Sequence, residues 1–370
     1  MKPRICILYT GGTIGMVTGA NGVIRPPEDP ADLLSVVPQI KDIVEFDFIP
    51  VRRLDGTLVN KDSIDMVILD WIAIATTIYE LRTEDYVGFV VVHGVDTMAY
   101  SASAVAFALG PNLNFPVVFV GGQSAATLPH GDGQINLIRA CKVAATLPIA
   151  EVVICCNNRV FRGCRAQKRD DRDFDAFESP GVSPICVIKD SLDPHRDHKK
   201  QQPSLDDIIL RTNFADGILP VPITPATPPS MLMPAIESDV CRGVILQTSG
   251  GGNVPDSLDM SYIWLIEKSR ALGKTVIITS MFPYEPNEFL VYQSGIDASN
   301  AGAIQITGIV FPALVTKLSW VLGLLEKPGR APAAKQQVEA FMKTPYVDEI
   351  NPIPGFPKTL SLDFVDAATA

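Results

Sequence analysis

The sequence is short of positive charge, and this limits the partners it can have. Its 370 residues include 31 Lys and Arg against 41 Asp and Glu, which gives a formal net charge of -10 at pH 7 and a pI of about 4.9. No localised basic stripe interrupts this excess of acid. Nucleic-acid phosphates would repel such a surface, so we expect no nucleic-acid partner.

Long apolar runs are also missing. No stretch approaches the ~18 uninterrupted apolar residues of a membrane span, because the richest segment, 308–325, contains Pro312 and Lys317. The first nine residues lead straight into a strand-like run, without the apolar core and cleavage site of a signal peptide. We therefore expect a cytoplasmic protein without a membrane partner.

Metal-binding side chains are sparse. The four histidines are scattered, and His195 and His198 lie in a polar stretch typical of a solvated loop. Cys155 and Cys156 are adjacent and lack metal-ligand spacing, so we expect neither a metal nor an organic cofactor. The cysteine count of seven is odd, and several cysteines lie in apolar runs. This favours reduced, buried thiols.

Hydrophobic residues are plentiful, at 47%, and the length suggests about two domains. In the first half, short β-rich runs alternate with helical patterns. The predicted strands are 5–9, 88–92, 117–120 and 151–156, and the predicted helices are 63–81, 98–109 and 134–147. This rhythm predicts an α/β fold with a doubly wound, mostly parallel sheet.

A polar, proline-rich stretch separates this half from a second α/β pattern. We predict a larger N-terminal α/β domain at 1–190, a linker at 191–229 and a smaller C-terminal α/β domain at 230–370. The later predicted strands are 244–247, 275–279 and 308–311. The later predicted helices are 259–272, 297–303, 313–325 and 334–343.

Two polar motifs follow predicted strands, where open parallel sheets bind their ligands. Thr10-Gly11-Gly12-Thr13-Ile14-Gly15 follows the first strand, and His93-Gly94-Val95-Asp96-Thr97 follows strand 88–92. Taken alone, the first motif could be a glycine-rich turn or a phosphate loop. It lacks the full fingerprint of a nucleotide site. Taken alone, Asp96 could cap the helix that follows.

Together the motifs resemble the two signatures of the bacterial-type L-asparaginase family, closest to the cytoplasmic type I enzymes. The resemblance extends over most of the chain outside the linker and the tail. It includes Asp62-Ser63-Ile64-Asp65-Met66, Asn157-Asn158-Arg159, Lys168, Phe174-Asp175-Ala176-Phe177, Gly250-Gly251-Gly252-Asn253 and Thr316-Lys317-Leu318. It implies a two-domain amidohydrolase that forms a homodimer or homotetramer.

The resemblance also implies roles for individual residues. Thr13 would be the nucleophile that attacks a side-chain amide, and Asp96 and Lys168 would complete the catalytic set. Ser63 and Asp62 would help to hold an amino-acid-like substrate, with Asn253 contributed by the second half. Asp96 would face the substrate's α-amino group.

The chain departs from the family pattern at several positions. Val95 replaces the second catalytic threonine, so a hydroxyl is lost while the shape is kept. Ile64 replaces a serine, and Pro312 and Gly308 replace acidic residues in a segment that in many relatives faces a neighbouring active site. Val23 stands near the position of a lid tyrosine that some members carry.

Three interpretations stay open. The chain can be an amidohydrolase for asparagine or a bulkier, less polar relative. It can be an acyl transferase, if Thr13 is acylated but water is poorly activated beside Val95. It can also be a non-catalytic amino-acid-binding protein, because loss of one catalytic group can cost several orders of magnitude in rate.

Overall fold

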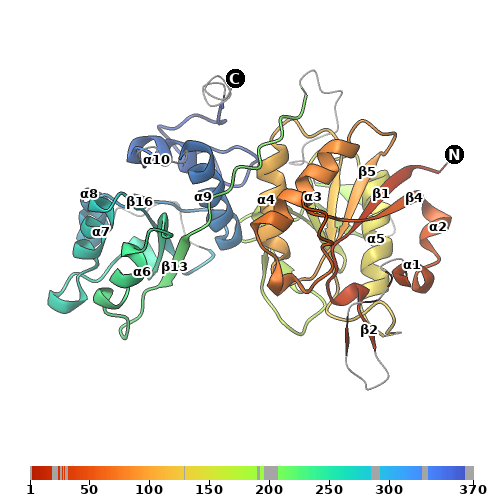
Figure 1. Ribbon diagram of the computed structural model, residues 1–370, viewed down its shortest axis with the longest axis horizontal. Coiled ribbons are helices and arrows are strands. Elements are labelled where there is room, and N and C mark those ends of the chain that lie inside the picture. The colour runs from red at the N-terminus through yellow and green to blue at the C-terminus, as the bar shows by residue number, and fades with distance from the viewer. Residues whose placement is uncertain are drawn as a thin grey trace. The chain divides into compact units, whose positions relative to one another are not determined.

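The computed structural model describes residues 2–18, 24–25, 27, 29, 32–128, 130–189, 192–195, 207–284, 292–326 and 332–362. The chain forms two units, Met1–Thr212 and Asn213–Ala370, each with its own sheet and helices (Figure 1). The predicted fold class is confirmed, with a large, mostly parallel sheet in the first unit and a smaller parallel sheet in the second. Val23 and His198 lie outside the described residues.

The first sheet has the order β12-β11-β8-β7-β6-β5-β1-β4. Its parallel part consists of β1 (Arg4–Tyr9), β4 (Glu45–Pro50), β5 (Gly88–Val92), β6 (Val117–Val120) and β7 (Val152–Cys156). An antiparallel arm adds β8 (Arg159–Arg162), β11 (Cys186–Ile188) and β12 (Leu192–Pro194). Two short antiparallel pairs lie outside it, β2 (Val17–Thr18) with β3 (Ile24–Arg25) and β9 (Gln167–Lys168) with β10 (Phe177–Glu178).

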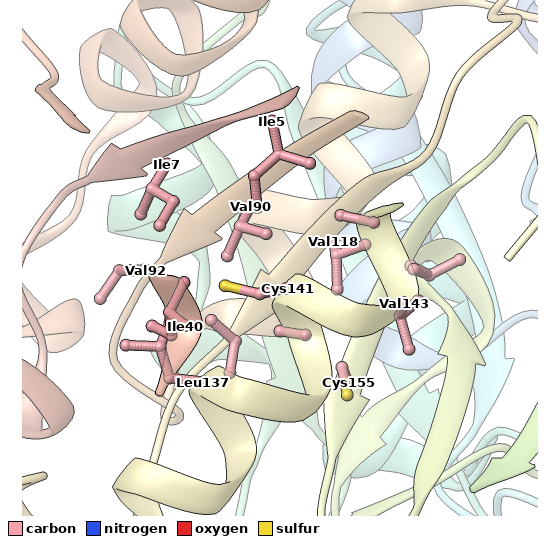
Figure 2. Close-up of a cluster of buried hydrophobic side chains, with 14 of the residues drawn as sticks. Ile5, Ile7, Ile40, Val90, Val92, Val118, Leu137, Cys141, Val143 and Cys155 are labelled. Atoms are coloured by element: carbon pink, nitrogen blue, oxygen red, sulfur yellow. The ribbon is translucent and has the colours of Figure 1, made fainter. Parts of the chain in front are cut away.

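Helices cover both faces of this sheet. On one face, α5 (Gly133–Thr146) packs on the parallel strands together with α1 (Asp32–Val36) and α2 (Ile40–Ile43). On the other face lie α3 (Ile68–Leu81) and α4 (Met98–Leu109). Figure 2 shows the core of the first face, built from Ile5, Ile7, Val90, Val92 and Val118 of the strands with Ile40, Leu137 and Cys141 of the helices. The alternate strand positions are buried as well, which explains their continuous apolar runs.

The second unit is a four-stranded parallel sheet. Its strands are β13 (Ile218–Pro222), β14 (Gly243–Thr248), β15 (Thr275–Ser280) and β16 (Ile304–Gln305), in this spatial order. One face is covered by α6 (Met233–Glu237), α7 (Tyr262–Ala271) and α8 (Gln293–Ala301). α9 (Phe311–Leu325) packs against β13, and α10 (Lys335–Lys343) packs on α9.

Most of the predicted elements are confirmed. β5, β6 and α4 have the predicted bounds, and β1, β7, α5, α7, β14, β15, α9 and α10 differ from their predictions by a few residues. The predicted helix 63–81 is divided into a 3₁₀ turn at Ser63–Asp65 and α3. The extended backbone of Met66 and Val67 separates these two segments.

The predicted strand 308–311 is wrong. The last strand of the second sheet is β16, and Gly308 takes a φ of +67° in the bend that follows it. Pro312 then occupies the first turn of α9, where a missing N–H costs nothing and the fixed φ favours a helix. The four apolar residues before Ala313 therefore belong to a bend and a helix start.

Two strands were not predicted. β4 is amphipathic and half-buried, and it occupies an edge of the first sheet. β13 lies inside the predicted linker 191–229, and it contains Pro220 and Pro222. It occupies an edge of the second sheet, which is where a strand tolerates proline.

No helix in the described ranges combines the length and the apolarity that crossing a bilayer would require. All seven cysteines lie in those ranges, as buried thiols. Burial raises the pKa of Cys141 to about 12, so this thiol stays protonated and unreactive.

A buried ion pair holds the chain after α10 against α9. The Lys317 ammonium contacts the Glu349 carboxylate at 2.5 Å and donates to the carbonyls of Met342 and Thr344. Glu349 also accepts the backbone N–H of Tyr346. Both charged side chains are fully buried, so each depends on these partners for the solvation it has lost.

We predict that Glu349→Ala lowers the free energy of unfolding by about 3–5 kcal/mol, because it leaves the Lys317 charge buried without its counter-ion. Urea denaturation measures the change. Glu339→Ala is the matched control, since Glu339 pairs with Lys343 in a partly exposed i,i+4 contact. We expect that change to cost less than about 1 kcal/mol. Equal losses in the two variants would contradict the role given to the buried pair.

Candidate functional site

The strand order changes direction at β1. The chain passes from β1 to β4 on one side and then returns across β1 to β5 on the other side. In an open parallel sheet, the crevice beyond the carboxyl ends of two such strands is where ligands bind. The two polar motifs follow β1 and β5, so they meet at this point.

The loop after β1 is fastened to its neighbours before it reaches Thr13. Both the backbone N–H and the hydroxyl of Thr10 donate to the carbonyl of Val92, at 3.0 and 2.8 Å. The N–H of Gly12 donates to the carbonyl of Lys61 at 2.9 Å. A 3₁₀ turn then begins at Thr13, whose side chain is half-buried. The candidate nucleophile is therefore held by its neighbours and partly accessible.

Gly12 brings the two loops into contact. Its φ is +86°, and a Cβ on this residue would overlap the backbone of His93 and Gly94. Only glycine satisfies both conditions without strain. The contact places Thr13, the next residue, beside the turn that carries Val95 and Asp96.

His93 supports this turn from below. Its ring is fully buried, and Nδ1 lies 2.7 Å from the carbonyl of Gly94. Nε2 has no hydrogen-bond partner among the described residues. Burial lowers the pKa of His93 to about 4, although the Gly94 carbonyl and the charges of Asp70 and Asp62 oppose it. The imidazole is therefore neutral at physiological pH.

Val95 and Asp96 point to different environments. Val95 is buried, and its Cγ1 lies close to the backbone of Gly121. The Asp96 side chain is 48% exposed. The N-cap of α4 is Thr97, which makes no side-chain capping bond. Asp96 is thus not the cap of this helix, and its carboxylate is available to other partners.

Ser63 is brought to the same place. The hydroxyl of Thr97 donates to the Ser63 carbonyl at 2.6 Å, and the N–H of Thr97 contacts Ser63 Oγ at 3.4 Å. Ser63 itself is fully buried, and a Cβ on Gly94 would overlap its hydroxyl. Asp62 caps the Ser63 turn by accepting the N–H of Ile64 at 3.4 Å. Ile64 is 70% exposed, so it forms an apolar surface at this edge.

Lys168 closes the arrangement from the side of β9. Its ammonium contacts Asp96 Oδ1 at 2.5 Å and Asp171 Oδ1 at 2.6 Å. Partial burial lowers the pKa of Lys168, but the hydrogen bonds and charges of Asp171 and Asp96 outweigh it. The net result is a pKa above the ordinary value. Lys168 is therefore an ammonium that reaches its neutral, basic form only at high pH.

Asp171 and Thr97 are two contacts that the motifs did not predict. Asp171 lies three residues after Lys168 in a run of charges, and it is 90% exposed. The only sequence signal for it was that spacing, which also fits an exposed loop. Thr97 is part of the second motif, but its bonds to Ser63 join segments 34 residues apart and leave no local pattern.

Asn253 belongs to the second unit. Its Nδ2 donates to the carbonyl of Gly250, and its Oδ1 accepts the hydroxyl of Ser294 at 2.9 Å. The structure thus brings Thr13, Asp96, Lys168, Ser63 and Asp62 to one edge of the first sheet. The part of Asn253 in substrate binding stays a prediction. Within the described ranges, no group of three or more His, Cys, Asp or Glu could hold a metal ion.

Comparison with known proteins gives consistent matches. A family model described as Asparaginase, N-terminal, matches residues 4–200. L-asparaginase 1 of Escherichia coli (strain K12) is 32% identical over 336 residues, covering 87% of this chain and 92% of that protein. A glutamyl-tRNA(Gln) amidotransferase component from Thermofilum pendens is 31% identical over 342 residues, covering 88% and 72%.

Some relatives are considerably longer than this chain. The 60 kDa lysophospholipase of Mus musculus is 30% identical over 86% of the chain, which spans 58% of that protein. Among solved structures, L-asparaginase I from Vibrio cholerae superimposes with a TM-score of 0.77 at 27% identity, covering 95% of this chain and 99% of that one. The relatives share a family but carry different names, so the family alone does not fix the substrate.

We predict that Asp171→Asn lowers the pKa of Lys168, because it removes one of the two carboxylates that raise it. NMR titration of ¹³C-labelled lysine should show a larger neutral fraction at pH 10 than in the unmodified protein. The difference should shrink in high salt, since Asp171 is exposed. Asp173→Asn removes the same charge from the same loop without touching Lys168. An equal shift in both variants would contradict the contact.

Proposed function

Because the chain belongs to the asparaginase family, we propose that it is an amidohydrolase with Thr13 as its nucleophile, acting on the side-chain amide of asparagine or a related amino-acid amide. The observation that carries the proposal is the contact of the Thr13 loop with the Gly94–Asp96 turn beyond β1 and β5. This contact gathers a hydroxyl, a carboxylate and, through Asp96, an ammonium at the switch point of the sheet.

In the first half-reaction, Thr13 Oγ attacks the amide carbonyl carbon. The C–N bond breaks, the nitrogen takes up a proton and leaves as ammonia, and an ester remains on Thr13. We assign proton transfer to Lys168, which must first release a proton. Because its pKa is raised, the neutral fraction grows about tenfold per pH unit below that pKa. The rate of this step should therefore rise toward alkaline pH.

The same residues suit an amino-acid substrate. The half-exposed carboxylate of Asp96 is available for an α-ammonium, and Ser63 lies beside it through Gly94. We assign the α-carboxylate to Ser63, with Asp62 fixing the turn of Ser63 and with Asn253 as a contribution from the second unit. The exposed apolar side chain of Ile64 favours a substrate with an apolar extension.

In the second half-reaction, water must attack the ester on Thr13. A hydroxyl at position 95 could accept or relay a proton there, whereas the methyl groups of Val95 cannot. Val95 is buried against Gly121, so its side chain also occupies space that a water molecule would need. We therefore propose that deacylation is the slow step.

Slow deacylation favours a second candidate function, acyl transfer. The ester on Thr13 would be cleaved by an amine or thiol in place of water, and the acyl group would pass to that acceptor. One relative is named as part of an amidotransferase. A third possibility, amino-acid binding without catalysis, would appear as substrate binding without an ester on Thr13.

We further propose that the protein acts in the cytoplasm as a homodimer or homotetramer. Seven buried thiols suit a reducing compartment. Light scattering of the purified chain tests the assembly, and a mass of 40.0 kDa, that of one chain, would exclude it.

We predict that Thr13→Ala lowers ammonia release by at least about a thousandfold, because it removes the attacking oxygen. The assay compares asparagine, glutamine and N-substituted asparagines as substrates. Thr13→Ser keeps a hydroxyl at the same position and should retain measurable activity. Undiminished hydrolysis by Thr13→Ala would show that Thr13 is not the nucleophile.

We predict that Val95→Thr raises the hydrolysis rate by about 10²-fold, the lower end of what a positioned proton-transfer group contributes. Val95→Ala is the control, because it makes room for water without adding a hydroxyl. Hydroxylamine in the assay separates the candidates. If deacylation is slow, it should accelerate turnover of the unmodified protein and yield the hydroxamate. Binding of aspartate without either product would favour the non-catalytic alternative.

A further inference from the structure

A buried carboxylate lies behind the candidate site. Asp70, in the first turn of α3, is fully buried and accepts three hydrogen bonds. Its donors are Arg53 Nε at 2.7 Å, the backbone N–H of Val67 at 2.9 Å and Lys61 Nζ at 3.2 Å. Burial raises the pKa of Asp70, but these three donors together outweigh it and lower the pKa below the ordinary value. Asp70 is therefore ionised.

The two cations differ in what their backbones do. The N–H of Lys61 donates to the carbonyl of Thr10 at 3.2 Å, and its carbonyl accepts the N–H of Gly12 at 2.9 Å. A Cβ on Gly11 would overlap the backbone of Lys61, so the two segments run in direct contact. The main chain of Lys61 thus supports the loop that carries Thr13.

Arg53 serves a different segment. Its backbone N–H donates to Thr57, and its carbonyl accepts the N–H of Gly56, so these bonds close a turn at 53–57. Asp70 therefore holds two cations, of which only Lys61 has main-chain bonds to the residues just before Thr13.

We propose that the Asp70–Lys61 ion pair positions the nucleophile loop: it fixes the backbone of Lys61, which in turn fixes Gly12 and Thr13. Asp62 and Ser63 follow Lys61 directly, so the same anchor orders the segment assigned to the substrate. Asp70 and Lys61 are positioning residues, and neither is assigned a contact with substrate. This inference rests on the proposed function where it concerns rate, but the ordering of the loop can be measured without any turnover.

The test compares Lys61→Met with Arg53→Met, because each removes one cation from the same carboxylate and keeps an aliphatic side chain. Hydrogen exchange of the segment 10–16 reports the loop directly. We expect at least about tenfold faster exchange in Lys61→Met and little change in Arg53→Met. Where the unmodified protein turns over, kcat should fall about tenfold or more in Lys61→Met with KM nearly unchanged, and Lys61→Arg should restore it.

The outcomes separate the inference from the proposed function. Equal effects of the two methionine variants on exchange in 10–16 would overturn the inference, since the pair would then only stabilise the unit. Absence of turnover in the unmodified protein on every amide would count against the proposed function. In that case, faster exchange confined to Lys61→Met would still support the anchor. Asp70→Asn should reproduce the effect of Lys61→Met on exchange if the protein folds.

Discussion

The close approach of Gly12 and Gly94 is the constraint on which the candidate site depends. Neighbouring strands lie about 4.8 Å apart, so loops that leave β1 and β5 side by side can touch only where neither carries a side chain. A Cβ on Gly12 would overlap Gly94, and a Cβ on Gly94 would overlap Ser63. Three segments thus meet through two glycines, and Thr13 takes its position from that meeting.

Fold and chemistry separate at Val95. Valine and threonine have nearly the same shape, and the residue is buried against Gly121 without disturbing the turn. Packing therefore cannot tell the two residues apart, whereas proton transfer can. A similarity of fold to asparaginases extends over nearly the whole chain and is equally compatible with hydrolysis, acyl transfer and binding. Chemical measurement at Thr13 is what distinguishes these functions.

Much of the fold could be predicted from the sequence because buried parallel strands are continuous apolar runs. The same reasoning failed where burial and secondary structure part, as at 308–311, where an apolar run is a bend and a helix start, and at β13, an edge strand with two prolines. In the site, the motifs located Thr13 and Asp96, whereas Lys168 was chosen only through the resemblance. Asp171 escaped notice because its contact depends on loop geometry.

Asp96 has two tasks in the proposed function, and they compete. It holds the Lys168 ammonium at 2.5 Å, and it is also the carboxylate assigned to the substrate's α-ammonium. A second cation beside Asp96 weakens the attraction that keeps Lys168 protonated and adds repulsion, so both effects lower the pKa of the lysine in the complex. Asp171 keeps Lys168 in place meanwhile. Substrate binding itself would then bring the lysine closer to its basic form.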